Sequence, residues 1–125
     1  MYLSFVVCIR LVVTQKSFAK CWRAMFAGRL LTVFPYGAVY VGLDSVLRDF
    51  FGRLFTDFDE FAANGSEFFE SGEQVIALGS YSGRARRTGK RFTARFAHVW
   101  TLQDGLIVRL QQCADTVQLA RALVD

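Results

Sequence analysis

Hydrophobic and polar residues alternate most regularly in the last third of the chain. Over 90–102 the even positions are mostly aromatic or aliphatic, and most of the polar residues fall on the odd positions. A period of two is the pattern of a strand with one buried face. The segments 74–86 and 106–114 also suit strands, and Thr88-Gly89 and Asp104-Gly105 supply turns between them. The sequence therefore predicts an antiparallel meander of three strands.

A helical period marks two earlier segments. Between Ser17 and Leu30 apolar residues recur every three or four positions, with Ser17 and Gly28 placed to cap the two ends. The same spacing predicts a second helix over 44–54. Its expected buried stripe comprises Leu43, Val46, Leu47, Phe50, Phe51 and Leu54.

Two further elements complete the expected fold. The mixed stretch 57–73 carries turn signals at Asn64-Gly65 and Ser71-Gly72 and predicts one or two short strands. Asp115, with Gln118 three residues later, is a capping-box arrangement that predicts a short final helix. Helices followed by a curved antiparallel sheet make a single α+β domain over 1–125. A sheet wrapped on a helix leaves a cone that can hold a ligand.

The only histidine, His98, falls on the apolar face of the strand over 90–102, together with Phe96 and Trp100. A two-residue loop at 104–105 would place Arg109 opposite Trp100, in the core. We therefore predict a three-residue loop at 103–105, which pairs His98 with Leu110 and leaves Gln112 diagonal to it.

Candidate chemistry on this face is limited. A buried neutral imidazole has a lowered pKa and needs a polar partner for catalysis. The candidate partners are Gln112, Tyr81 and Tyr36, none of which is a carboxylate. Tyr81 reaches the face only if the odd positions of its strand point inward, and the sequence leaves that choice open. A structural histidine and a catalytic one both fit these residues.

Composition adds three constraints. Hydrophobic residues make up 53% of the chain and Phe counts 13, enough for a core and for an apolar pocket. The net charge is +4, and six basic residues fall between Arg84 and Arg95, as a solvated hairpin tip or a phosphate-binding patch. Three cysteines without a CxxC pair or a histidine cluster argue against disulfides and zinc and favour a reducing cytoplasm. We expect no metal and no cofactor.

The N-terminal stretch YLSFVVCIRLVV is apolar but interrupted by Arg10. It is too short to span a bilayer and lacks the basic region and cleavage site of a signal peptide. We expect it to pack as part of the domain, with no membrane partner.

The segments PYGAVYVGLDSVLRDFFGRL, SGEQVIALGSYSGRARRTGKRF and AHVWTLQDGLIVRLQQCADT resemble SnoaL-like proteins of the ketosteroid-isomerase-related group, within the nuclear-transport-factor-2-like superfamily. The resemblance is best over 36–124, whereas 1–30 is an atypical N-terminal helical region. It implies a cone-shaped α+β fold and a homodimer formed through the sheet. It also implies an isomerase, a polyketide cyclase, an epoxide hydrolase or a binder without catalytic activity.

The resemblance places family roles on three positions. The isomerase base corresponds to Phe34, just before Pro35. The isomerase oxyanion donor falls near His98, which also matches the cyclase histidine. The cyclase acid/base carboxylate corresponds to Gln112. Both expected carboxylates are therefore missing.

Three functions follow as expectations. The first is binding of a small hydrophobic, steroid- or polyketide-like molecule. Its expected contacts are Trp100, Phe96, Gln112, Tyr81, Tyr36, Phe34 and Phe50. The second is an isomerase, cyclase or hydratase that uses His98 as general acid/base. The third, ranked last, is weak nucleic-acid or anion binding through the hairpin 84–95.

Overall fold

Six strands form one curved sheet in the computed structural model, which describes residues 26–32, 37–104 and 106–125. The strand order is β2-β1-β6-β5-β4-β3. The strands are β1 (Phe26–Thr32), β2 (Ala38–Val41), β3 (Phe58–Ser71), β4 (Gln74–Ala85), β5 (Arg91–Gln103) and β6 (Leu106–Ala114). The predicted meander is confirmed as β4, β5 and β6. The sheet is mixed rather than purely antiparallel, because β1 pairs with β6 in parallel.

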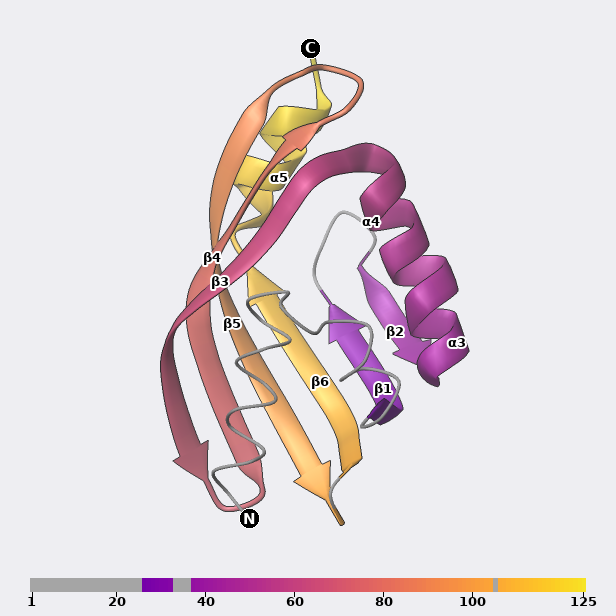
Figure 1. Cartoon of the computed structure of the whole chain (residues 1–125), viewed down its shortest axis with the longest axis vertical. Helices are drawn as coiled ribbons and strands as arrows, with labels where there is room; N and C mark the ends of the chain where they lie inside the picture. The colour runs from indigo at the N-terminus through magenta and orange to yellow at the C-terminus, as the bar shows by residue number, and fades with distance from the viewer. Residues whose placement is uncertain (1–25, 33–36, 105) are drawn as a thin grey trace.

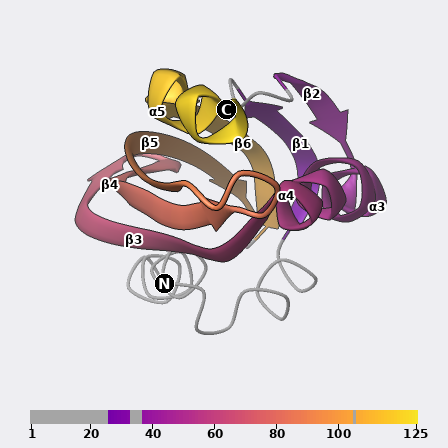
Figure 2. The same cartoon turned by 90° about the horizontal axis from the view of Figure 1, so that it is seen from above.

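A helical run connects the two edge strands β2 and β3 (Figure 1). It comprises α3 (Leu43–Ser45), a π-helical turn η1 (Val46–Phe51) and α4 (Gly52–Asp57), which confirms the helix predicted over 44–54. Val46, Phe50 and Leu54 are its buried residues. The run contacts β1 and β2 near its start and β3 at its end, so both edges of the sheet reach the same helix. The view from above in Figure 2 shows the resulting curl, and the expected α+β fold with a sheet curved around a helix is confirmed.

The helix predicted over 17–30 is wrong where the structure describes it, since residues 26–30 lie in strand β1. Gly28 helps to explain why this segment forms a strand rather than a helix. A Cβ built on Gly28 would lie 1.7 Å from the carbonyl oxygen of Val108 in β6, so glycine lets the two backbones approach. The Gly28 carbonyl also accepts from the N–H of Gly42 at 2.8 Å. Residues 17–25, like the N-terminal stretch, lie outside the described residues.

One long strand, β3, replaces the one or two short strands expected over 57–73. The turn at Ser71-Gly72 is confirmed, with Gly72 at a φ of 59°. The turn at Asn64-Gly65 is wrong, because this dipeptide lies within the strand beside a register shift between Gly65 and Glu67. A second shift, between Asp59 and Ala62, coincides with a positive φ of 53° at Glu60. Two bulges thus bend β3 without interrupting it.

The β5–β6 register differs from the prediction. Leu102 pairs with Ile107 and Thr101 with Arg109, so Val108 is the extra residue of a bulge. The predicted three-residue loop is therefore wrong: the loop has two residues, and the bulge keeps Arg109 out of the core. His98 pairs directly with Gln112 rather than with Leu110.

The chain ends in helix α5 (Thr116–Leu123), at the position expected. Asp115 occupies the N-cap position, but its side chain makes no capping hydrogen bond, so the capping-box prediction is wrong. Leu119 and Ala122 of α5 are buried in the same core cluster as the sheet and the helical run.

Candidate functional site

The inner face of β5 carries the histidine, as the alternation predicts. His98 is 6% exposed, between Phe96 at 4% and Trp100 at 0%. The rings of Phe96 and His98 stack with centroids 4.2 Å apart, and Trp100 meets His98 edge-on at 5.7 Å. The imidazole is therefore flanked by two aromatic side chains of its own strand.

The structure also settles which face of β4 points inward. Its odd positions are buried, so Tyr81 lies on the inner face, with its ring 4.4 Å from that of Phe96. The Tyr81 ring also lies beside that of Phe61, with centroids 5.2 Å apart. The Phe61 ring in turn lies beside that of Phe92, with centroids 6.0 Å apart. Phe61 was not among the predicted site residues. It lies at the β3 bulge, and nothing in the sequence pattern marks that bulge.

A chain of hydrogen bonds joins three of the predicted polar residues. The amide nitrogen of Gln112 donates to the hydroxyl oxygen of Tyr81 at 2.5 Å. Tyr81 in turn shares a short hydrogen bond with Nε2 of His98. Because the tyrosine oxygen already accepts from Gln112, its single proton is best placed on the bond to His98. Nε2 of His98 is then an acceptor.

This assignment fixes the state of the imidazole. Burial lowers the pKa of His98 to about 3, so the ring is neutral at physiological pH. A neutral ring that accepts at Nε2 carries its proton on Nδ1. Burial also raises the pKa of Tyr81, which keeps its hydroxyl protonated. The cluster is therefore uncharged.

Nδ1 of His98 is buried and has no hydrogen-bond partner among the residues that the structure describes. An unmet buried donor costs about 1–3 kcal/mol relative to a satisfied one. The hydrogen-bonding capacity of His98 is therefore only half used by the residues that the structure describes. The inner face thus carries the Nδ1–H donor of His98 beside the indole of Trp100, on an otherwise aromatic surface.

One predicted site residue that the structure describes is not brought to His98. Phe50 is buried in the helical run, where its ring meets Tyr40 at 5.6 Å and Phe51 at 5.0 Å. No ring contact between described residues joins it to His98. Phe34 and Tyr36 lie outside the described residues.

Carboxylates are absent from the buried polar groups of the described chain, which are His98 and Gln112. The same residues contain no cluster of three or more side chains suited to a metal ion. None of the described helices is both long and apolar enough to cross a membrane.

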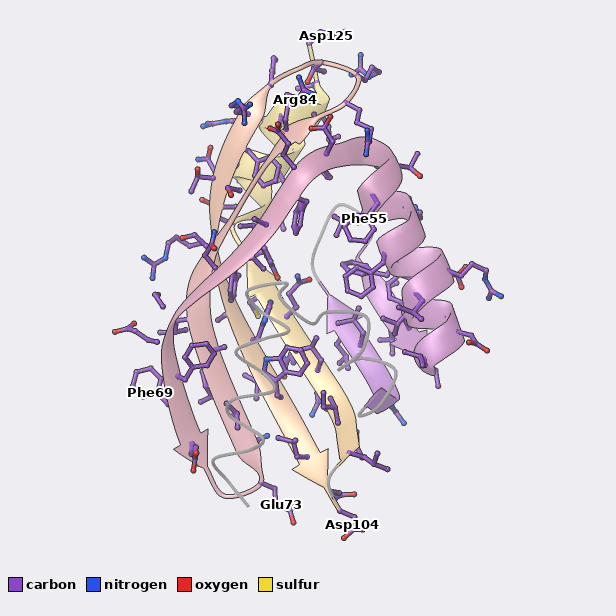
Figure 3. The ribbon with its side chains drawn as sticks, viewed as in Figure 1. Phe55, Phe69, Glu73, Arg84, Asp104 and Asp125 are labelled. Carbon is purple, nitrogen blue, oxygen red and sulfur yellow. The ribbon has the colours of Figure 1, made fainter. Side chains whose placement is uncertain are left out.

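Several basic residues of the hairpin 84–95 form ion pairs with acidic residues of the same molecule. Arg84 pairs with Asp59 at 2.7 Å, and this hydrogen bond holds the pKa of Asp59 below its usual value. Arg91 pairs with Glu60 at 2.9 Å. Figure 3 shows Arg84 at the same end of the molecule as Asp125, opposite the end with Glu73 and Asp104.

The hairpin tip also caps α5. Arg87 and Thr88 donate to the carbonyls of Leu123 and Ala122, each at 2.5 Å, and Lys90 donates to that of Val124. These carbonyls lie at the end of a helix, where no further turn supplies donors. The tip of the hairpin therefore has a structural role.

Comparison with known proteins places the chain in a family. The model of the SnoaL-like domain matches residues 13–110, and the chain belongs to this family. A nuclear-transport-factor-2-like protein from Burkholderia thailandensis is 31% identical, with a TM-score of 0.85 over 96% of this chain and 95% of that one.

Two more distant structures share the fold. A nuclear-transport-factor-2-like protein of unknown function from Burkholderia pseudomallei is 24% identical, with a TM-score of 0.80 over 96% of this chain and 97% of the other. TerC, co-crystallised with polyporic acid, is 18% identical, with a TM-score of 0.80 over 97% of this chain and 96% of its own. Among curated proteins, none matches the sequence.

Proposed function

We propose that the inner face of the sheet binds a small, largely apolar molecule with a hydrogen-bond acceptor, such as the carbonyl of a steroid- or polyketide-like compound. The observation that carries this proposal is the buried Nδ1–H of His98, which has no partner among the described residues. An acceptor on the ligand would satisfy this donor. The rings of Phe96, Trp100 and Tyr81 would supply apolar contact.

Two further points support the proposal. The cluster is neutral, so it favours an uncharged acceptor over an anion, which would lose its hydration without gaining a counter-charge. TerC has the same fold and was co-crystallised with a small organic molecule, polyporic acid.

The experiment compares matched ligands by thermal shift and calorimetry. A polycyclic ketone and the corresponding hydrocarbon differ only in the acceptor. We expect the ketone to raise Tm more than the hydrocarbon, and His98→Gln to remove the difference. Glutamine can keep the bond to Tyr81 through its carbonyl oxygen, but its amide N–H groups do not occupy the position of Nδ1. A broad panel of apolar ligands that leaves Tm unchanged would overturn the proposal.

The second candidate is an enzyme of the isomerase, cyclase or hydratase type. With Nε2 engaged by Tyr81 and a pKa of about 3, His98 is poorly suited to general acid/base catalysis near neutral pH. A donor at Nδ1 could instead stabilise negative charge that develops on a substrate oxygen. Turnover of a ketone substrate that survives in His98→Gln would exclude this role.

We also propose that the chain forms a homodimer through the outer face of the sheet. Phe69 is 50% exposed and, as Figure 3 shows, lies at the outer side of β3. It pairs with Ile76, which pairs with Val99, so an apolar row crosses three strands. Phe69→Lys should convert a dimer into a monomer in analytical ultracentrifugation. A wild-type chain that is monomeric at high concentration would contradict the proposal.

The proposal also covers the cellular location of the protein and its binding of nucleic acid. The odd cysteine count without a CxxC pair supports the cytoplasm. Nucleic-acid binding through the hairpin has less support, because Arg84 and Arg91 already pair with acids and Arg87 and Lys90 with the end of α5.

A further inference from the structure

A row of hydrogen-bond donors crosses four adjacent strands on the outer face of the sheet. Gln74 pairs with Thr101, Thr101 with Arg109, and Arg109 with Arg29. Neighbouring strands lie about 4.8 Å apart, so the four side chains project side by side. We call these four residues the outer row. It lies on the side of the sheet opposite to His98.

The two arginines of the outer row have no counter-charge within the part of the chain that the structure describes. Arg29 and Arg109 are paired positions on neighbouring strands, and both are exposed. Neither forms an ion pair with any residue that the structure describes. Like charges opposite each other on a sheet are destabilising, and an anion between them would remove that cost. This contrasts with Arg84 and Arg91, whose charges are matched.

The two polar members of the row add a further donor. Nε2 of Gln74 donates to Oγ1 of Thr101 at 3.3 Å. The threonine oxygen acts as acceptor in this bond, so its own proton is available for another partner. The row thus presents a hydroxyl donor next to two guanidinium groups, which suits the two oxygens of a carboxylate.

A groove of about 570 Å³ runs along the row. No acidic residue of the described ranges lines it. Its lining consists of the outer row together with the apolar residues Leu31, Val39 and Val108. The lining is therefore part cationic and part hydrocarbon, a combination that fits a small organic anion rather than an inorganic one.

We propose that this groove is a second binding site, which holds a small organic carboxylate with its head on Arg29 and Arg109 and its apolar body against Leu31 and Val39. The site does not depend on the ligand proposed for the inner face. The apolar row at Phe69 crosses β3, β4 and β5 on the same face, with Ile76 and Val99 two residues from Gln74 and Thr101. Arg29 and Arg109 lie further from β3, on β1 and β6.

The test uses naphthalene-2-carboxylate, its uncharged carboxamide and inorganic phosphate. Binding is followed by two-dimensional NMR, which gives both the affinity and the residues that respond. We expect saturable binding of the carboxylate with shifts at Arg29, Thr101 and Arg109, and at least about tenfold weaker binding of the carboxamide. Inorganic phosphate should bind more weakly than the carboxylate, because it makes no use of the apolar wall.

The matched variants are Arg109→Gln and Arg95→Gln. Arg95 is also exposed on β5 and has no ion pair among the described residues, but it does not line the groove. We expect about tenfold weaker carboxylate binding in Arg109→Gln and no change in Arg95→Gln. Equal losses in the two variants, equal affinity for the carboxamide, or shifts centred on His98 would each overturn the proposal. So would a second copy that occupies the groove, seen as concentration-dependent shifts at Arg29 and Arg109 without carboxylate binding.

Discussion

The single histidine gives folding stability a specific dependence on pH. Burial lowers the pKa of His98 to about 3 in the folded chain, whereas an unperturbed imidazole titrates near 6.5. Below pH 6.5 the unfolded chain therefore binds a proton that the folded chain does not bind. Stability rises with pH wherever the unfolded state binds more protons, so it must fall as the pH drops from about 6.5 toward about 3.

The size of this effect follows from the two pKa values. Each pH unit below 6.5 costs about 1.4 kcal/mol, so from pH 7.5 to pH 5 the histidine removes about 2 kcal/mol of unfolding free energy. His98→Gln is the matched comparison, because glutamine does not titrate and its carbonyl oxygen can accept from Tyr81. The 11 Asp and Glu residues are common to both proteins and cancel in the difference.

Urea unfolding followed by tryptophan fluorescence at pH 7.5 and pH 5 provides the measurement. We expect the wild type to lose about 2 kcal/mol more than His98→Gln over this interval, with unchanged m-values. Equal losses in the two proteins would refute the reasoning, because they would mean that the folded chain accepts a proton on His98 as readily as the unfolded chain does.

Three further predictions concern the site and its support. Long-range ¹H–¹⁵N spectra of the His98 ring should show a neutral tautomer protonated at Nδ1 down to pH 5, and an Nε2-protonated ring would contradict the assignment. Tyr81→Phe removes the donor to Nε2 and should cost about 1–3 kcal/mol in urea unfolding; a neutral effect would show that the hydrogen bond is not formed. Gly28→Ala, whose Cβ would meet the Val108 carbonyl at 1.7 Å, should cost about 3 kcal/mol or more. Gly52→Ala, whose Cβ would lie 3.8 Å from the Leu47 carbonyl oxygen, should gain about 0.5–1 kcal/mol. A Gly28→Ala protein as stable as Gly52→Ala would show that β1 and β6 do not approach closely.

Residue alternation predicted the inner face of β5 correctly because side chains change sides at every step of a strand. His98, Phe96 and Trp100 share the buried face for this reason alone. The helix over 44–54 was predictable for a similar reason, since its apolar spacing is carried by six residues. The face of β4 could not be chosen from its own residues, because both of its faces are apolar. Packing against β5 decided it in favour of Tyr81.

Local backbone irregularities were not predictable from periodicity. The spacing of Phe26 and Leu30 suits a helix as well as a strand, and only the parallel partner β6 selects the strand. The bulge at Val108 is invisible to any count of loop residues. The prediction compared two simple loops by the faces they produced and chose the one that kept Arg109 out of the core. The chain reaches the same face by a tight loop followed by a bulge.

These irregularities are what assemble the polar cluster. With the bulge at Val108, Gln112 lies directly opposite His98 instead of diagonal to it. On the other side of β5, His98 pairs with Ala77, and Tyr81 is four residues further along β4. Between them Gly79 has no side chain, and a Cβ there would lie 2.7 Å from the Phe96 ring. The missing side chain leaves room for the Phe96 ring, against which both Tyr81 and His98 pack. The tautomer, and with it the free donor at Nδ1, therefore depends on one extra residue in β6 and one absent side chain in β4.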